Sequence, residues 1–572
     1  MRWTHKQIPP REKVVQLSEA LQIDDVLSTL LVQRGIETFE QARSFFRPTY
    51  ELLHDPFLMK DMDKAAERIL RAISDEERIL VYGDYDVDGT TSVAMMYSFL
   101  RELHPEVTTY IPDRYTEGYG ISLKGIDYAR DNEIGLIIAL DCGVKALEQS
   151  RYAAEKGIDL IVCDHHRPGP ELPTAVAVLD PKREDCDYPY KELCGCGVGF
   201  KLVQALADRL EMDASRILPL LDLVATAIGA DIVPITGENR VLAALGMQQI
   251  NSQPRPGIKA LREQVSKTEL SITDVVFILA PRINAAGRMQ HGNQAVELLA
   301  ESDLDRAREL AVAIEENNSD RRETDRSITQ EALQLIEDEG KADGFTTVVY
   351  RPHWHKGVIG IVASRLIETY YRPTLVFTRS GDCLAASARS VKGFDVYEAL
   401  EQCADLLIQF GGHTYAAGLT MKEENYEAFR DRFEQVVSKT IDPKCLEPEL
   451  RIDAPLDLEQ CTPRFYRILK QFAPFGPGNS TPVFYADKLV DNGYGKRVGS
   501  DQSHLKLSVS QGGSTVLAGI GFGLGDRLEL IEGGRMFRAA FSLDENHWNG
   551  RTTLQLRVRD IKSMSEADIP SA

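Results

Sequence analysis

The sequence predicts an α/β protein with a doubly wound parallel sheet, a long linking helix, a smaller α/β domain and a C-terminal β-barrel. Three observations support this order. Short apolar runs alternate with helical patterns between residues 77 and 235. Residues 303–339 contain neither Pro nor Gly, and beyond residue 450 apolar and polar side chains alternate. These patterns are typical of a buried parallel sheet, of one long helix or a helix pair, and of strands with one buried face.

Length and composition agree with several globular domains. The chain has 572 residues, enough for roughly three or four domains. Apolar residues make up 43% and charged residues 27%, which excludes a disordered or fibrous chain. The formal net charge of −21 excludes a basic field over the whole surface that would hold nucleic acid nonspecifically. A local basic groove, or a site in which bound cations supply the positive charge, is compatible with it.

Cysteine usage and hydropathy indicate the compartment. The nine cysteines are scattered, and no C-x-x-C pair repeats, so we expect reduced thiols in a cytoplasmic protein. Met1–Lys6 lacks the apolar run of a signal peptide. No stretch approaches ~18 uninterrupted apolar residues, so the sequence predicts no membrane segment.

We expect five segments along the chain. The first contains short amphipathic helices, and the third is the long helix, although a solvated surface helix would show the same charge pattern. The expected bounds are 1–48 for the N-terminal helical segment, 49–302 for the larger α/β domain, 303–340 for the linking helix, 341–445 for the smaller α/β domain, and 446–572 for the barrel and tail.

Strand–helix–strand repetition predicts the larger α/β domain. The apolar runs 78–82, 135–140 and 159–163 have the length of buried strands, and helical patterns over 91–103 and 144–156 follow the first two. Right-handed crossovers then place helices on both faces of a parallel sheet.

Two shorter regions complete the predicted fold. In the smaller α/β domain, strands over 346–350 and 374–377 flank a helix over 357–370. Farther on, residues 504–510 alternate in polarity, and Asn549-Gly550 is a strong signal for a hairpin turn. About five short strands in this region favour a small β-barrel.

Acidic and imidazole side chains follow three successive strands of the larger domain. Ligands of open α/β sheets bind outside the carboxyl ends of the strands, so these side chains should meet in one crevice. They are Asp84, Asp86 and Asp88 after the first strand, Asp141 after the second, and Asp164, His165 and His166 after the third.

Such a group of carboxylates would repel itself unless cations bind. Carboxylates mixed with imidazole suit Mn²⁺ best, with Mg²⁺ as the alternative, and their number favours two metals about 4 Å apart. Taken alone, Asp141 would be a helix N-cap and the His pair structural. Residues 84–89 also begin like a calcium loop, but the twelfth position is Met95 and a strand precedes the loop.

Taken in order, the motifs of this chain resemble the DHH phosphoesterase superfamily and, within it, its single-strand-specific 5′→3′ exonucleases. The resemblance covers nearly the whole chain and implies a DHH domain, a DHH-associated domain and an OB-like barrel. It rests on 83–89, Asp141, Asp164-His165-His166, 225–234, 281–288, Gly411-Gly412-His413 and 475–479.

The resemblance also implies two divalent cations and a set of ligands. Asp141 would bridge the two cations, and Asp86 would bind the first of them. Asp88, Asp231 and His165 would bind the second.

The neighbours of these ligands would have supporting roles. Asp84 would be either a ligand or a residue that orients one, because Tyr82 stands where many superfamily members have a His. Asp164 and His166 would orient ligands or contact phosphate, close to the reaction.

Residues of the second lobe would present the substrate. By resemblance, Arg114, Arg288, Ser387 and Arg389 form a pocket for the 5′ phosphate, and we expect Ser387 and Arg389 in a loop. For each isolated arginine the alternative is a surface or interdomain ion pair.

A glycine-rich segment would lie beside the substrate as well. Gly411 and Gly412, also expected in a loop, would let backbone N–H groups approach phosphate. His413 would lie near the scissile phosphate, and its alternative role is to cap a helix.

We therefore expect an exonuclease that cuts single-stranded DNA 5′→3′ to nucleoside 5′-monophosphates in DNA repair and recombination. One alternative keeps the metal site but acts on short oligonucleotides or small phosphoanhydrides, which would leave the extra barrel unexplained. Another is a noncatalytic scaffold, against which the intact ligand set argues. The resemblance alone implies a monomer with a single-strand binding protein and a helicase as partners.

Overall fold

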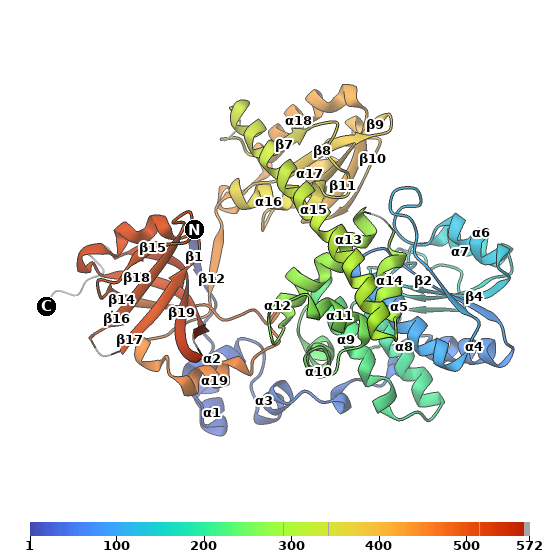
Figure 1. Ribbon diagram of the computed structural model, residues 1–572, viewed down its shortest axis with the longest axis horizontal. Coiled ribbons are helices and arrows are strands. Elements are labelled where there is room, and N and C mark those ends of the chain that lie inside the picture. The colour runs from blue at the N-terminus through green and yellow to red at the C-terminus, as the bar shows by residue number, and fades with distance from the viewer. Residues whose placement is uncertain (290, 341–342, 514, 549, 565–572) are drawn as a thin grey trace. The chain divides into compact units, whose positions relative to one another are not determined.

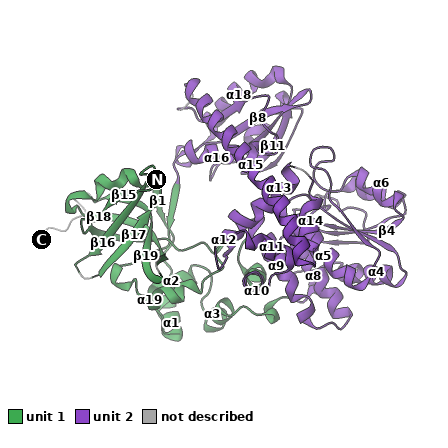
Figure 2. Cartoon of the chain, in the orientation of Figure 1, with its two compact units in different colours: residues 1–54, 232–245, 449–572 green, residues 55–231, 246–448 purple. Residues whose placement is uncertain are grey.

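The computed structural model describes residues 1–564 except 290, 341–342, 514 and 549, and it divides into two compact units (Figure 2). One unit contains 55–231 and 246–448. The other contains 1–54, 232–245 and 449–572. The first 54 residues thus share a unit with the C-terminal region.

The first of these units contains a five-stranded parallel sheet in the order β3-β2-β4-β5-β6. Figure 1 labels β2 and β4 of this sheet. Leu80, Ile137 and Leu160 pack in one core with side chains of α6 and α7. Ile79 and Ile138, one position along their strands, point to the opposite face and are equally buried. Both faces are therefore covered, which confirms the doubly wound parallel sheet. The strands are β2 (Arg78–Gly83), β3 (Val107–Tyr110), β4 (Ile134–Leu140), β5 (Asp159–Cys163) and β6 (Ala177–Leu179).

The strand order places the candidate residues where the order of the sheet reverses, at its topological switch point. β2 pairs with β3 on one side and with β4 on the other. The chain therefore changes direction across the sheet between β2 and β4. The carboxyl ends of two such strands form the crevice in which doubly wound proteins bind ligands.

Helices surround this sheet and continue beyond it. The expected linking helix is a single helix, α15 (Leu304–Asp338), of 35 residues and roughly 50 Å, capped by Asp303. The other helices are α4 (Met62–Ser74), α5 (Val87–Leu103), α6 (Leu123–Asp131), α7 (Leu147–Glu155), α8 (Gly195–Arg209), α9 (Leu221–Ala230), α11 (Pro256–Glu263), α13 (Ala280–Met289) and α14 (Asn293–Ala300). A further helix, α10 (Gly237–Ser252), contributes residues to both units.

A second, smaller α/β domain follows α15 in the same unit. Its sheet has the order β10-β11-β9-β8-β7, with β7 and β8 parallel and the other pairs antiparallel. Phe377, Phe429 and Phe433 lie in its core. Its elements are β7 (Thr347–Tyr350), α16 (Ile359–Thr369), β8 (Thr374–Ser380), β9 (Cys383–Arg389), α17 (Val396–Glu401), β10 (Gln409–His413), β11 (Ala416–Met421) and α18 (Tyr426–Thr440).

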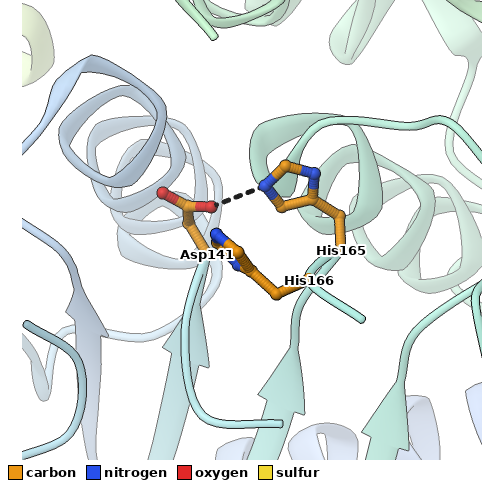
Figure 3. Close-up of side chains that lie close together, drawn as sticks. All are labelled: Asp141, His165 and His166. Carbon is orange, nitrogen blue, oxygen red and sulfur yellow. Dashed lines mark ion pairs between the residues drawn. The ribbon is translucent and has the colours of Figure 1, made fainter. Parts of the chain in front are cut away.

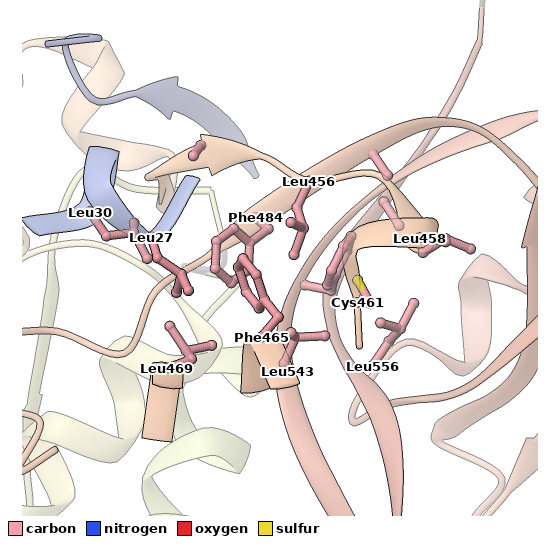
Figure 4. Close-up of a cluster of buried hydrophobic side chains, with 14 of the residues drawn as sticks. Leu27, Leu30, Leu456, Leu458, Cys461, Phe465, Leu469, Phe484, Leu543 and Leu556 are labelled. Carbon is pink, nitrogen blue, oxygen red and sulfur yellow. The ribbon is translucent and has the colours of Figure 1, made fainter. Parts of the chain in front are cut away.

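The other unit is built around a closed β-barrel. Its sheet has the order β13-β14-β18-β19-β17-β16-β15, and an additional pairing of β14 with β16 closes it. Figure 4 shows Phe465 and Phe484 in its core with Leu27 and Leu30 of the N-terminal helices. The strands are β13 (Ala454–Pro455), β14 (Phe484–Asp491), β15 (Lys496–Val498), β16 (His504–Gln511), β17 (Thr515–Gly521), β18 (Phe537–Trp548) and β19 (Arg551–Ser563).

The remaining elements of this unit come from both ends of its sequence. The N-terminal strand pairs in parallel with β12, from Arg2↔Glu449 to His5↔Ile452. β18 and β19 pair antiparallel, as the predicted hairpin requires, while Asn549 of its turn lies outside the described residues. The elements are β1 (Arg2–His5), α1 (Arg11–Leu21), α2 (Asp25–Val32), α3 (Phe39–Phe46), β12 (Glu449–Ile452) and α19 (Pro463–Lys470).

Two chain-wide features bear on the sequence expectations. Among the described residues, no helix is both long and apolar enough to cross a bilayer. All nine cysteines are free thiols.

Candidate active site

The turn from β2 into α5 positions the first three carboxylates. Asp86 caps α5, because its Oδ1 accepts a hydrogen bond of 3.0 Å from the Gly89 N–H. The helix therefore starts at Val87, with Asp88 in its first turn. A Cβ at Gly89 would lie 2.3 Å from the Asp84 carbonyl oxygen, so only glycine fits where the helix meets the strand end.

The ends of β4 and β5 position the next acidic groups. Asp141 has a left-handed backbone, φ 58°, and its N–H donates to the Cys163 carbonyl at 2.8 Å. In the same way the Asp164 N–H donates to the Leu179 carbonyl of β6 at 2.9 Å. These bonds extend the sheet by one residue, so both aspartates lie at its carboxyl edge.

Asp164 holds the two histidines that follow it. Its Oδ1 accepts from the N–H groups of His165 and His166 at 2.8 and 3.1 Å, and from Nδ1 of His166 at 2.8 Å. Its Oδ2 accepts from the Val144 N–H at 2.9 Å. Burial alone would raise the pKa of Asp164, but His166 and these donors lower that pKa to about 2. Asp164 is therefore an anion that fixes the His166 ring and the backbone of His165.

His165 lies at the centre of the carboxylates. Its Nε2 is 3.1 Å from Asp141 Oδ1, 3.7 Å from Asp88 Oδ2 and 3.7 Å from Asp231 Oδ2. Figure 3 shows the ring turned toward Asp141, with His166 beside it. Burial lowers the pKa of His165 to about 3, and His166 acts in the same direction. The ring is therefore neutral, which is the form that binds metals.

Burial and mutual repulsion raise the pKa values of the carboxylates. Burial is the larger cause for Asp88 and Asp141, whose pKa values lie well above the ordinary range. Burial and Asp86 raise the pKa of Asp84 to about 8 and that of Asp231, whose side chain is 30% exposed, to about 7. Because Asp86 acts on all four, its carboxylate lies among them.

The chemistry of these residues fits divalent cations. The buried Oδ2 of Asp84 and Oδ1 of Asp141 accept no hydrogen bond within the described part of the chain. A cation would give these oxygens a partner and relieve the repulsion. Two groups of three residues each bring their ligand atoms within 4.8 Å of one another. One group is Asp88, His165 and Asp231, and the other is Asp141, His165 and His166. Asp84 and Asp86 belong to neither set.

The three predicted arginines, Arg114, Arg288 and Arg389, form one basic cluster with Arg321, which the sequence did not single out. Burial and the charges of Arg114, Arg321 and Arg389 together lower the pKa of Arg288 to about 10, so the four guanidinium groups are neighbours. Arg114 stacks 4.0 Å above the Tyr85 ring. Among the described residues, neither Arg114, Arg288 nor Arg389 forms an ion pair, so the ion-pair alternative has no support there.

Ser387 and Arg389 lie in strand β9, so their expected placement in a loop was wrong. Four small residues follow one another in this strand, residues 385–388, so the sequence shows no clear alternation of apolar and polar side chains. Arg389 Nη1 donates to Ser387 Oγ at 3.0 Å. A Cβ at Gly360, in the first turn of α16, would lie 2.9 Å from both Arg389 Nη2 and Ser387 Oγ.

Gly411, Gly412 and His413 also lie in a strand, the edge strand β10, where a loop was expected. Gly412 has a φ of 148°, and a Cβ there would lie 2.4 Å from the Ala416 carbonyl oxygen of β11. All three residues are exposed. Within the described part of the chain, His413 forms no hydrogen bond or ion pair with the carboxylates.

The structure adds residues that the sequence did not single out. The Tyr119 hydroxyl donates to the Asp141 carbonyl at 2.8 Å and lies 3.4 Å from the His166 ring. Asp180 follows β6 and is buried, which raises its pKa to about 7. Asp180 follows a fourth parallel strand as the other aspartates follow theirs. That strand, β6, has only three residues, which is too short for its apolar run to be recognised in the sequence. Tyr82 is structural, because its hydroxyl donates to the Gly120 carbonyl at 2.9 Å.

Comparison with known proteins gives three family matches along the chain. Residues 78–228 match the DHH family, N-terminal domain. Residues 343–439 match the DHHA1 domain, and residues 452–560 match the RecJ OB domain. The matches follow the order of the two α/β regions and the barrel.

Individual relatives extend the likeness over nearly the whole chain. The single-stranded-DNA-specific exonuclease RecJ of Bacillus subtilis is 37% identical over 564 residues, which are 98% of this chain and 70% of that protein. The Escherichia coli protein of the same name is 35% identical, over 88% of this chain and 90% of its own. The crystal structure of RecJ from Thermus thermophilus in complex with Mn²⁺ has a TM-score of 0.85 at 28% identity, over 99% of this chain and 80% of that one. The Mg²⁺ complex from the same organism has a TM-score of 0.78.

Proposed function

The chain belongs to the RecJ family of DHH phosphoesterases, and on that premise we propose that it is a metal-dependent exonuclease that degrades single-stranded DNA 5′→3′ to nucleoside 5′-monophosphates. Its place would be in DNA repair and recombination. The observation that carries the proposal is the neutral His165, with Nε2 within 3.7 Å of three acidic side chains.

The proposed cofactors are two divalent cations, Mn²⁺ or Mg²⁺. When bound, they would lower the pKa of a coordinated water and neutralise charge on the phosphoryl oxygens. Asp141 would contact both, and its buried Oδ1, which accepts no hydrogen bond in the described chain, supports that role. The other ligands would be Asp86 for one cation and Asp88, His165 and Asp231 for the second, with Asp84 a ligand or an orienting residue.

Asp164 and His166 would act beside the cations. Burial lowers the pKa of His166, but the bond to Asp164 and the charges of Asp164, Asp231 and Asp88 together raise the pKa overall. A protonated ring held by a buried carboxylate can donate to a phosphoryl oxygen. We assign His166 to that contact and Asp164 to holding the ring in place. His413 would lie near the scissile phosphate.

The basic cluster would bind the 5′ end of the strand. Arg114, Arg288 and Arg389 are guanidinium groups without ion-pair partners in the described chain, so a phosphate would complete their contacts. Ser387 Oγ, already bonded to Arg389, would join them. Gly411 and Gly412 would let the backbone of β10 approach the single-stranded DNA.

The cellular context and the domain bounds complete the proposal. Nine free thiols favour a reducing compartment, and we propose the cytoplasm. A monomer with a single-strand binding protein and a helicase as partners fits the family. We keep the division 1–48, 49–302, 303–340, 341–445 and 446–572 as the proposed domain bounds.

The test is degradation of 5′-labelled single-stranded DNA with Mn²⁺, beside its duplex and beside pyrophosphate. Labelled mononucleotide should appear from the single strand alone and should be lost in Asp141→Ala. Hydrolysis of pyrophosphate or dinucleotides alone would favour a small-substrate phosphodiesterase. Strand binding without cleavage would favour a scaffold. Either of these outcomes rejects the proposal.

A further inference from the structure

The first turn of α8, residues Cys194–Gly197, holds one of the acidic side chains at both of its oxygens. The Gly195 N–H donates to Asp88 Oδ2 at 2.7 Å, and the Cys196 N–H donates to Asp88 Oδ1 at 2.7 Å. Cys194 caps the helix, because its Sγ accepts from the Gly197 N–H at 3.3 Å. Asp88 comes from α5, so the turn connects two helices through a carboxylate.

These two hydrogen bonds fix the plane of a carboxylate that is fully buried. The free N–H groups at a helix start, together with the helix dipole, favour an anion there. Burial by itself would favour the protonated acid. Each carboxylate oxygen has two lone pairs, so one on each stays available to a cation. The first turn of α8 therefore fixes the plane of the Asp88 carboxylate and favours its ionised form, although burial and the neighbouring acids still raise its pKa.

The same turn lies against a second acidic residue. A Cβ at Gly195 would lie 2.6 Å from Asp141 Cβ, 2.6 Å from Asp141 Oδ1 and 2.8 Å from Asp141 Cα. Real Cβ atoms do not approach other atoms so closely, and two of the three, Asp141 Cβ and Cα, cannot be moved by turning the Asp141 side chain. Even the smallest side chain at 195 would have to move Asp141 or the turn.

Asp141 has little freedom to retreat. Its backbone is in the left-handed region at φ 58°, which few conformations of a non-glycine residue allow. Its N–H is bonded to the Cys163 carbonyl and its carbonyl accepts from Tyr119. If the turn moves instead, the two N–H groups that hold Asp88 move with it.

We propose that Gly195 is a positioning residue of the metal centre. It sets the separation of the Asp88 and Asp141 carboxylates, because its N–H holds one while its missing side chain admits the other. The inference rests on the proposed function of this site, which it deepens.

Two other glycines of α8 provide matched controls. A Cβ at Gly197 would meet nothing closer than Leu193 Cδ2 at 3.4 Å, an ordinary contact. A Cβ at Gly199 would lie 3.1 Å from Met95 Cε and 3.2 Å from Leu140 Cδ2, so it strains core packing without touching a carboxylate. Gly197→Ala controls for the substitution itself, and Gly199→Ala for a loss of stability.

The experiment measures Mn²⁺ binding to the full chain by calorimetry and by the electron paramagnetic resonance signal of free Mn²⁺. Displaced supporting residues typically cost ~10–100-fold in metal affinity, so Gly195→Ala should raise the dissociation constant by at least ~10-fold. It should also lower kcat at saturating Mn²⁺, while the affinity for a 5′-phosphorylated strand without metal stays unchanged. Gly197→Ala and Gly199→Ala should bind Mn²⁺ as the parent does, Gly199→Ala with a lower melting temperature.

The outcomes separate this inference from the proposed function. A parent protein that binds no Mn²⁺ rejects the metal centre itself. If the parent binds Mn²⁺ and Gly195→Ala binds it equally well, the role of Gly195 is rejected. The role is also rejected if Gly195→Ala and Gly199→Ala lose the same affinity for Mn²⁺. If Gly195→Ala does not fold, Cys194→Ala decides, since it loosens the same turn without adding atoms. Losing this cap should raise the dissociation constant at least about twofold, and an unchanged constant overturns the inference.

Discussion

Stripped of divalent cations, the protein should lose stability as the pH rises from 5.5 to 7.5. Burial raises the pKa of Asp84 to about 8 from an ordinary value of 3.8. Across this range the folded state keeps a proton that the unfolded state has released. The stabilisation is complete below the unfolded value and is lost as the pH rises through about 8.

The size of the effect follows from the proton difference. Between pH 5.5 and 7.5, Asp84 should remove about 2.6 kcal/mol of unfolding free energy, and Asp231, with a pKa of about 7, about 1.9 kcal/mol. His165 opposes them by about 1.4 kcal/mol, because its folded pKa of about 3 lies below the ordinary 6.5. These three groups together give a loss of about 3 kcal/mol, and the raised pKa values of Asp88, Asp141, Asp180 and His166 add to it.

Urea unfolding at pH 5.5, 6.5 and 7.5, with EDTA or with saturating Mn²⁺, measures this loss. Mn²⁺ should flatten the pH dependence, because a bound cation keeps the carboxylates ionised in the folded state too. Asp84→Asn is the matched variant, and without metal it should reduce the loss by about 2.6 kcal/mol. A stripped protein as stable at pH 7.5 as at pH 5.5, or an Asp84→Asn variant with the parent's pH dependence, would refute the reasoning.

Three further predictions concern single side chains. Asp164→Asn removes the charge that holds His166 and sets an NH2 group against a backbone N–H, so kcat/KM should fall ~10–100-fold and the melting temperature should fall with it; an activity near that of the parent would contradict the orienting role. Arg389→Ala should weaken binding of a 5′-phosphorylated oligonucleotide by about tenfold and leave the 5′-hydroxyl form unaffected, measured by fluorescence anisotropy, whereas an equal loss for both would place Arg389 elsewhere on the strand. Phe484→Ala should cost about 3–5 kcal/mol in the barrel core, seen by calorimetry as a lower transition for that unit, and a cost below about 1 kcal/mol would contradict its packing.

The sequence predicted the parts of the fold that depend on local periodicity. Apolar runs such as 159–163 became buried parallel strands, and 303–339 became one helix because no residue in it ends a helix. Because carboxyl ends of parallel strands share one edge, Asp141 and His165 were predicted to meet, and they lie 3.1 Å apart. Short-range pattern and a topological rule were sufficient there.

Other features depend on contacts between distant segments, and no local pattern encodes them. Gly411 and Gly412 lie in a strand because β11 pairs with them, although glycine is a poor strand residue. Gly195 is required by Asp141, which stands 54 positions earlier in the sequence. Arg321 belongs to the basic cluster only because α15 packs against α13, which carries Arg288. Close approach in three dimensions decided each of these positions.

The local arrangement of charge also resolves how an acidic chain can hold a polyanion. The net charge of −21 describes the whole surface, yet binding depends on the charge at the site. There, the acidic residues are arranged to take cations, whose charge would then face the phosphate. Beside them, Arg114, Arg288 and Arg389 lie together without carboxylate partners in the described chain, so the protein's own acids do not neutralise their charge. Buried like charges are costly to hold together, and a bound phosphate would remove that cost. A substrate should therefore stabilise the unit that carries these arginines on binding, while the acidic remainder of the surface repels DNA held in any other way.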